Sequence, residues 1–552
     1  MSKVDVEKVK AESRGLRGSI AAEIGEETPR FSEEAASLLK FHGTYQQEDR
    51  DARKTAREHG GEKDYQFMIR VRATAGRIPA RLWSAIDELV DAHGNGTIRV
   101  TTRQALQIHG VRKRDLKTVI GDVVAHLGST LATCGDVVRN VCAPAWPYED
   151  AGYAATRQAA QAIARAFAPR TGGYLEIWQD GEIAHSEGAV DEPVYGATYL
   201  PRKFKIAVTV PGDNSVDLYT NDLGIVAIVR DGKVVSYNLA VGGGLGMTHN
   251  KAATFPRLAD HLGSIPPERL LDAVRAVVVV QRDHGDRTDR RHARLKYLIA
   301  DRGLDWFRAE VEREAGFRLE PWREIAPWED VPRYGWHAQG DGNWFYGLHV
   351  QSGRIRDTAD ARLKSALRAI ADRFGYEFIA TLGQQLLIAG VPTDGRAEID
   401  AILREHGVVA PEDVTPLRKR AMACPALPTC GLALAESERV IPALLDDVEA
   451  ALAQAGLDGQ AITIRMTGCP NGCARPFLAE IGLVGKSADR YQVYLGGDPA
   501  STRLAKLWRD GVRLAEVAPL LAPLFTAYRA QRAEGESFGD WTLREVLEEV
   551  PA

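Results

Sequence analysis

The chain reads YQFMIRVRATAGRIP at residues 65–79, ARLWSAIDELVDAHG at 80–94 and TIRVTTRQALQIHGV at 97–111. The first and last segments alternate apolar and polar residues, which predicts strands. The middle segment spaces its apolar residues three or four positions apart, which predicts a helix. Residues 65–111 are therefore expected to form a small α/β unit.

The same plan recurs about 280 residues later, in NWFYGLHVQSGRIRD (343–357), ADARLKSALRAIADRFG (359–375) and YEFIATLGQQLLIAGV (376–391). Aligning the two Gly-Val pairs that end the copies also aligns identical residues before them. These pairs are Thr101 with Thr381, Gln104 with Gln384, Leu106 with Leu386 and Ile108 with Ile388. The chain is therefore predicted to be an α/β (α+β) protein with a pseudo-twofold internal duplication.

The two copies differ in charge. Four arginines of the first copy align with uncharged residues or a histidine in the second, namely Arg70 with Gly347, Arg72 with His349, Arg99 with Ile379 and Arg103 with Gly383. Alternate residues of a strand share one face, so Arg70 with Arg72, and Arg99 with Thr101 and Arg103, are expected to form two basic faces. Solvated strand residues are the simpler interpretation, but two such faces favour one anionic partner bound by the first copy.

Four cysteines near the C-terminus form two close pairs, Cys424 with Cys430 (CPALPTC) and Cys469 with Cys473 (CPNGC). Four thiolates from two loops suit an iron–sulfur cluster or a tetrahedral zinc ion. The C-x5-C spacing is wider than zinc pairs usually show, so a cluster is favoured and a structural zinc site is the alternative. The other two cysteines, Cys134 and Cys142, are expected to be buried thiols.

Composition excludes several classes of protein. The net charge of −5 over 552 residues gives no nucleic-acid signature, and no window is apolar for long enough to span a membrane. The charged N-terminus MSKVDVEKVKAESRG lacks a signal-peptide core, and six cysteines do not make a disulfide framework, so a reducing cytoplasmic location is expected.

Further basic residues lie between the repeats. Lys203 and Lys205, in YLPRKFKIAV, are expected to share a strand face and, with Arg70 and Arg139, to clamp a small oxyanion. The run from Arg282 to Lys296 is treated as a helical charge run, either solvated or in contact with a cofactor. The glycines of VGGGLG fail the dinucleotide spacing, so electrons would have to come from a separate protein.

Taken together, C-x5-C with C-x3-C, TGCPNGC, YLPRKFK and VGGGL resemble the sulfite/nitrite reductase family that contains sirohaem and a [4Fe–4S] cluster, and within it the assimilatory haemoprotein (beta) branch. The resemblance runs from FHGTYQQEDRD (41–51) to GESFGDWT (535–542). It implies six-electron reduction of sulfite to sulfide. It also implies an extended segment (1–60), ferredoxin-like repeats (61–124 and 331–400), a sirohaem and substrate domain (125–330) and a cluster and sirohaem domain (401–552).

The resemblance also assigns roles to residues. Cys424, Cys430, Cys469 and Cys473 would hold the cluster, and Cys473 would also ligate the sirohaem iron. Substrate binding and proton supply would fall to Arg70, Arg139, Lys203 and Lys205. The sirohaem carboxylates would be held by Arg72, Arg99, Thr101, Arg103, Arg294 and Lys296.

Two choices stay open on sequence alone. Lys205 favours sulfite, because nitrite-using members tend to carry Asn there, whereas Val138 before Arg139 and the altered VCAPAWP segment favour nitrite. The donor is expected to be an NADPH-dependent flavoprotein subunit, with a ferredoxin as the alternative.

Overall fold

The two repeated stretches form two antiparallel sheets that exchange a short strand. The computed structural model describes residues 4–53, 58, 61, 63–170, 176–179, 182–186, 192–330 and 332–547. The first sheet has the order β1 (Thr44–Glu48), β2 (Tyr65–Val71), β5 (Leu106–Val111), β4 (Ile98–Val100) and β14 (Arg354–Ile355). The second has the order β12 (Gly335–Ala338), β13 (Asn343–Leu348), β16 (Leu386–Pro392), β15 (Glu377–Ala380) and β3 (Arg77–Ile78). Since β14 and β3 each belong to the opposite repeat, each half completes the sheet of the other.

Backbone geometry confirms the predicted duplication. Arg70 pairs with Gln107 on β5, and Gly347 pairs with Leu387 on β16. Because Arg70 aligns with Gly347 and Gln107 with Leu387, the two repeats have the same strand register. Gln104 and Gln384 both have a positive φ, at 52° and 67°. Non-glycine residues seldom adopt this conformation, so its recurrence at equivalent turns marks a shared local structure.

The basic segment of the first copy differs from the expectation. Residues 97–111 are not one continuous strand, because β4 and β5 pair with each other as an antiparallel hairpin. The turn between them is closed by the N–H of Ala105, which donates to the hydroxyl of Thr101 at 3.1 Å. Arg99 therefore lies on β4 while Arg103 lies in the turn, and the two do not share a strand face.

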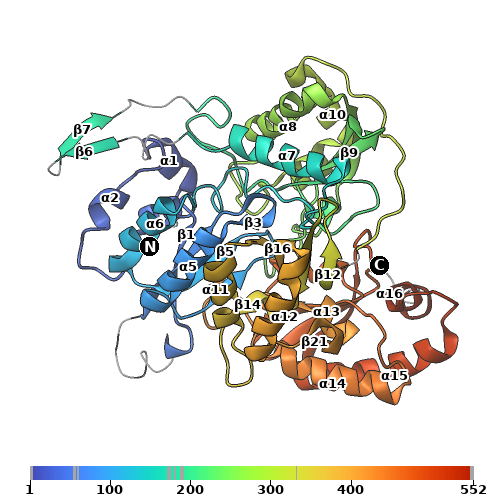
Figure 1. Ribbon diagram of the computed structural model, residues 1–552. Coiled ribbons are helices and arrows are strands. Elements are labelled where there is room, and N and C mark those ends of the chain that lie inside the picture. Colours follow the sequence, from blue (N-terminus) through green and yellow to red (C-terminus); the bar gives the residue numbers. More distant parts are fainter. Residues whose placement is uncertain are drawn as a thin grey trace.

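Two helices, α5 (Ala80–Ala92) and α11 (Leu363–Phe374), cover these sheets and pack against each other (Figure 1). Apolar residues at helical spacing, such as Leu82 and Ile86, point into a core common to both repeats. The rings of Trp83 and Phe378 stack across it with 4.5 Å between centroids. Further helices close the edges of this core, α6 (Leu116–Ala125) and α12 (Arg396–Glu405). The two ferredoxin-like half-domains thus share one hydrophobic core.

The larger domains are duplicated as well. One sheet has the order β11 (Asp260–Ile265), β10 (Lys233–Val241), β9 (Leu223–Arg230) and β8 (Ile206–Thr209). The other has the order β17 (Met422–Ala423), β18 (Ile464–Thr467), β19 (Ile481–Ser487), β20 (Arg490–Leu495) and β21 (Lys506–Arg513). β8–β9 and β18–β19 are both parallel pairs followed by antiparallel strands. Ile206 and Ile464, and likewise Leu223 and Ile481, begin equivalent strands 258 residues apart.

Each of the two larger domains has its own set of helices beside its sheet. The first large domain carries α7 (Ala151–Ala166), α8 (Leu270–His284), α9 (Leu295–Arg302) and α10 (Leu304–Ala315). The C-terminal domain carries α13 (Pro416–Arg420), α14 (Ile441–Gln454), α15 (Val517–Gln531) and α16 (Phe538–Thr542). The N-terminal segment forms α1 (Val6–Ala11), α2 (Ile20–Glu23) and α3 (Glu33–Leu39), and a separate hairpin contains β6 (Glu176–Gln179) and β7 (Glu182–Ser186). None of the described helices combines the length and apolar character that crossing a bilayer requires.

Two local predictions were wrong. The run from Arg282 to Lys296 is not one charged helix, because α8 ends at His284 and residues 285–294 form a loop before α9. The helical spacing of LALAESERVIPALLDDVEAALAQAG predicts a helix directly after Cys430, but the helix begins only at Ile441, so Cys430 lies inside a longer loop. In the first segment Gly285 follows the end of α8, and the carboxylate of Asp286 accepts hydrogen bonds from the N–H groups of Thr288 and Asp289, which compete with a helix.

Candidate active site

Two neighbouring parallel strands bring the cysteine loops together. Cys424 follows β17 and Cys469 lies just after β18, and the two strands pair in parallel. Carboxyl ends of parallel strands meet at one edge of a sheet, so the two loops converge there. Burial raises the pKa of the Cys469 thiol to about 12, and the nearby Cys473, Cys424 and Cys430 add to the effect. The four cysteines thus form one cluster of free thiols, with Cys473 exposed.

Backbone N–H groups and apolar side chains surround these sulfurs. The N–H of Gly468 donates to Cys424 Sγ at 3.4 Å, and the side-chain amide of Asn471 donates to Cys469 Sγ at 3.5 Å. Cys430 accepts from the backbone of Leu432 and Ala433. N–H···S bonds and an apolar surrounding are the features that stabilise and tune cluster thiolates.

The four sulfurs form a donor set of thiolates alone. In the described part of the chain, no three His, Cys, Asp or Glu side chains form a ready-made site for a single metal ion. Four thiolates from two loops, with N–H···S bonds around them, are a donor set that an iron–sulfur cluster uses.

Cationic side chains converge on Cys473. Both Lys203 and Arg70 lie within electrostatic range of this sulfur. Burial lowers the pKa of Lys203 to about 7, and Arg202, Arg294 and Arg139 lower it further. A lysine with a pKa near neutrality exchanges its proton readily at physiological pH.

Asp222 binds the main chain of Lys205, the second lysine that is predicted to handle substrate. Its carboxylate, 0% exposed, accepts from the N–H of Lys205 at 2.8 Å and from Arg294 at 2.6 Å. Burial lowers the pKa of Lys205 well below its ordinary value, and Arg294, Lys203 and Arg103 act in the same direction. The hydrogen bond to Asp222 fixes the main chain of Lys205, and the ammonium group of its side chain lies near other cationic side chains.

Arg70 and Arg139 converge from different elements on one stretch of loop. Both guanidinium groups donate to the carbonyl of Thr133, at 3.5 and 3.2 Å. Arg70 also contacts Cys134 Sγ at 3.1 Å, and the hydroxyl of Tyr45 hydrogen-bonds to the same thiol. The structure thus brings together all four residues predicted to handle substrate and adds Tyr45 beside them.

The residues predicted to hold sirohaem are distributed more widely. Arg72 donates to the carbonyl of Ala164 at 2.8 Å, and Arg103 donates to Asn221 Oδ1 at 2.6 Å. Thr101 closes the β4–β5 turn described above. Arg99 is 1% exposed and is paired with Glu438.

Lys296 and the glycine run meet next to the cysteine loops. The Lys296 ammonium group donates to the carbonyls of Gly244 and Gly246 at 3.0 and 2.8 Å, and to that of Phe255. Burial lowers its pKa to about 6. One residue past the run, the N–H of Met247 donates to the carbonyl of Pro470, within CPNGC, at 2.8 Å. The glycines therefore allow close approach of two backbone segments.

Sequence reasoning missed three residues of this site, Tyr45, Asp222 and Glu438. Tyr45 lies in the FHGTYQQEDRD stretch that carries part of the resemblance, which was the available signal. Asp222 and Glu438 gave no signal in sequence, because their partners are distant along the chain. Glu438 joins Arg99 and Arg354, one from each repeat, and its N–H donates to the carbonyl of Cys424 at 3.1 Å.

Known proteins match this chain over nearly its whole length. A family model described as the nitrite/sulfite reductase ferredoxin-like half domain matches residues 59–126 and again 337–406, and one described as the nitrite and sulphite reductase 4Fe-4S domain matches 158–319. The protein named sulfite reductase (ferredoxin) from Synechococcus elongatus is 48% identical over 97% of this chain and 88% of its own length. The chain belongs to the nitrite and sulfite reductase family.

Other comparisons agree with this family. The sulfite reductase (NADPH) hemoprotein beta-component of Staphylococcus saprophyticus is 45% identical over 99% of this chain and 96% of its own length. The structure of the Mycobacterium tuberculosis NirA protein shares the fold, with a TM-score of 0.80 at 24% identity over 99% of this chain and 97% of that one. As a nitrite and sulfite reductase family member, the chain is an oxidoreductase whose cofactors are sirohaem and a [4Fe–4S] cluster.

Residues 158–319, which match the 4Fe-4S model, contain no cysteine. Thiolate ligands must therefore come from another part of this reductase family member. The C-terminal loops contain the four neighbouring thiols described above.

Proposed function

We propose that this protein is a sulfite reductase, which reduces sulfite to sulfide by six electrons. The observation that carries the proposal is the convergence of Lys203, Arg139 and Arg70 near Cys473, because sulfite is a small dianion. Cations placed around a small oxyanion offset its charge and polarise its S–O bonds.

We assign the cofactors to the residues that the site brings together. Cys424, Cys430, Cys469 and Cys473 would hold the cluster, and Cys473 would also ligate the sirohaem iron. The bound sirohaem and cluster together supply the low-potential electrons for reduction. Arg72, Arg99, Thr101, Arg103, Arg294 and Lys296 would position the sirohaem directly or through their protein partners.

Protein side chains supply the protons. Lys203 has a pKa near 7, so its ammonium group gives up a proton readily as an oxygen of the substrate leaves as water. Arg139 holds positive charge beside it, and a bound oxyanion would favour the ammonium form of Lys205 against the burial that lowers its pKa. Arg70, restrained by Cys134 and the carbonyl of Thr133, orients the oxyanion.

The structure also bears on whether the substrate is sulfite or nitrite. The side chain of Val138 belongs to the hydrophobic core and is 3% exposed. Val138 therefore acts on the site only through the position of Arg139, whereas Lys205 places a second lysine within the basic cluster. A dianion favours the charged form of that lysine more strongly than the monoanionic nitrite does, and this supports sulfite.

The test is turnover of sulfite and nitrite by the purified holoprotein with an artificial low-potential donor. We expect a higher kcat/KM for sulfite, with sulfide as product, and a shift toward nitrite in Lys205→Asn. A higher kcat/KM for nitrite in the unmodified protein would transfer the assignment to nitrite reduction.

We further propose that the electrons come from a separate protein. Relatives are named for ferredoxin and for NADPH, so both donor types are candidates. An NADPH-dependent flavoprotein is the donor proposed from the sequence. The test measures sulfite turnover in parallel with a reduced ferredoxin and with an NADPH-fed flavoprotein. Turnover with ferredoxin but not with the flavoprotein would overturn the proposed donor.

A further inference from the structure

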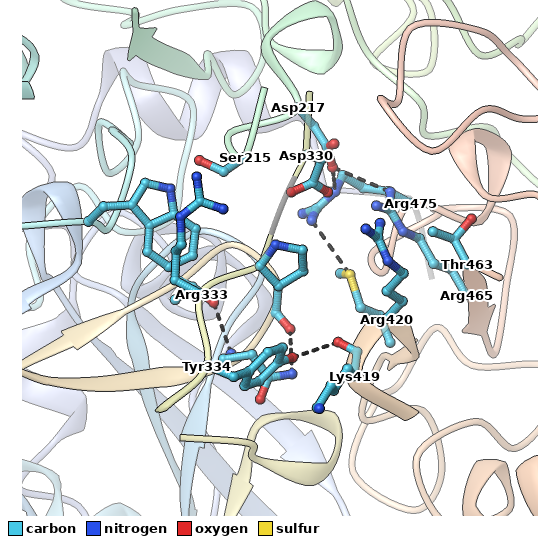
Figure 2. A pocket seen from close by; sticks show the side chains of 16 residues that line it. Ser215, Asp217, Asp330, Arg333, Tyr334, Lys419, Arg420, Thr463, Arg465 and Arg475 are labelled. Carbon is cyan, nitrogen blue, oxygen red and sulfur yellow. Dashed lines mark hydrogen bonds and ion pairs between the residues drawn. The ribbon is translucent and has the colours of Figure 1, made fainter. Parts of the chain in front are cut away.

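A small cavity, whose lining includes none of the four residues predicted to handle substrate, lies where several domains meet (Figure 2). It has a volume of about 50 Å³. Ser215 comes from the first large domain, Thr381 from the second repeat, and Arg420 and Arg465 from the C-terminal domain. Asp330 comes from the segment that joins the two halves of the chain. Cavities at domain interfaces are frequent sites for small ligands.

Internal symmetry relates this cavity to the active site. The repeats are offset by 280 residues and the larger domains by 258, as the strand registers show. On these offsets, three lining residues correspond to active-site residues, Ser215 to Cys473, Thr463 to Lys205 and Gly383 to Arg103. The cavity is therefore the counterpart of the active site across the pseudo-twofold axis and not an extension of it.

The lining is predominantly cationic. Five basic side chains face two carboxylates there, Arg333, Lys419, Arg420, Arg465 and Arg475 against Asp217 and Asp330. Asp217 is already neutralised, because it is paired with Arg475 and lies 3.4 Å from Arg465. Burial and the nearby Asp217 raise the pKa of Asp330 to about 6, which weakens its repulsion of an anion near that pH.

Two buried donors in the lining have no hydrogen-bond partner among the described residues. Arg465 is 3% exposed, and within that part of the chain neither its Nε nor the hydroxyl of Ser215 meets an acceptor. The side chain of Arg420 extends toward the same space in Figure 2. Buried unsatisfied donors are costly, so a site that collects them around one cavity is suited to an acceptor.

Cavity size limits the ligand. One water needs about 10–15 Å³ on this scale, so the volume accommodates roughly three to five heavy atoms. That is far too small for a tetrapyrrole and matches a tetrahedral oxyanion. The ligand must also accept hydrogen bonds and carry negative charge.

We propose that this cavity binds a small oxyanion of the phosphate and sulfate class. Arg420 and Arg465 supply the charge and Ser215 donates a hydrogen bond. The site is separate from the proposed sulfite site and does not depend on which substrate the enzyme reduces.

Calorimetric titration of the holoprotein tests the proposal. Cyanide first occupies the haem iron, so that added anion cannot bind there, and inorganic phosphate and inorganic sulfate are then titrated in separate arms near pH 6. We expect one anion per chain in at least one arm. If neither anion binds, or if Mg²⁺ binds in their place, the proposal is wrong.

Variants locate the site. Arg420→Ala removes a charge-assisted donor and is expected to weaken binding about tenfold or more. Ser215→Ala should weaken it less. The matched control is Arg404→Ala on α12, which removes the same charge from an exposed residue outside the cavity and should leave affinity unchanged. An unchanged haem spectrum verifies each fold, and equal weakening in Arg420→Ala and Arg404→Ala would overturn the assignment.

Discussion

Asp217 and Arg475 occupy equivalent positions in the two larger domains and form an ion pair with each other. Both have a left-handed backbone, with φ of 45° and 57°, and both immediately precede a short 3-10 helix, η4 (Leu218–Thr220) and η9 (Pro476–Leu478). Arg475 also donates to the carbonyls of Thr102 and Leu382, which are equivalent turn residues of the two repeats, at 3.1 and 3.0 Å. One guanidinium group thus ties all four domains together on the pseudo-twofold axis, two residues after Cys473.

Removing Asp217 should destabilise the whole protein. Asp217→Ala leaves the buried Arg475 and Arg465 without their carboxylate, and breaking a buried pair from one side costs about 3 kcal/mol or more. We expect a matching loss in the free energy of unfolding by denaturant titration. Glu398→Ala is the control, because its partner Arg373 is 60% exposed and such pairs contribute at most about 1 kcal/mol. Equal losses in both variants would contradict the axial role.

Cys473→Ser should disturb both cofactors. Serine is a poor ligand for iron in place of a thiolate, so iron and acid-labile sulfide per chain should fall and the haem absorption bands should shift. Cys142→Ser is the matched control, because Cys142 is buried in a separate apolar cluster beside Ala207 and Val226. A normal cofactor spectrum with normal turnover in Cys473→Ser would exclude this residue as the shared ligand.

The pH dependence of turnover should report Lys203. Its pKa is lowered to about 7, so the ammonium form that supplies protons is present below that pH and is lost as the pH rises through it. We expect kcat/KM for sulfite to fall on the alkaline side of neutrality. Sulfite itself also titrates near neutrality, so the decisive comparison is between variants.

Two lysine-to-arginine variants make that comparison. Lys203→Arg keeps its positive charge at all these pH values and should move the alkaline fall upward, although with a lower maximum because arginine does not release its proton. Lys486→Arg, a surface residue paired with Asp510, should keep the unmodified profile. An alkaline fall that stays in place in Lys203→Arg would assign it to the substrate alone.

Gly243→Ala should lower sirohaem content. A Cβ at this position would lie 2.1 Å from the carbonyl oxygen of Tyr219, so the loop that contacts CPNGC must shift. Overpacking of this kind costs about 1–3 kcal/mol. Haem per chain and the thermal midpoint measure both effects. Gly121→Ala, in open space on α6, should leave both unchanged or raise the midpoint slightly, and a similar haem loss there would refute the steric argument.

Local patterns in the sequence were sufficient for the duplication and for the cysteine loops. Alternation and helical spacing report which residues are buried, and the repeated Gly, Gln and Thr positions report turns that only certain backbones allow. The apolar stretch AITIRMTG predicts a strand directly before Cys469 for the same reason. Patterns of this kind depend on residues only a few positions apart, so they can be recognised in the sequence before the fold is known.

Only the tertiary structure decided how these parts join. The exchange of β3 and β14, the pairing of Glu438 with Arg99 and Arg354, and the ion pair of Asp217 with Arg475 connect residues that are 84 to 339 positions apart. No local pattern predicts such contacts, because the partners meet only after the apolar cores of the repeats and of the larger domains have packed together and fixed their positions. The sequence therefore determined which chemistry the protein carries, and packing of the duplicated domains determined that one side of the axis gathers lysines around Cys473 while the other encloses a small cationic cavity.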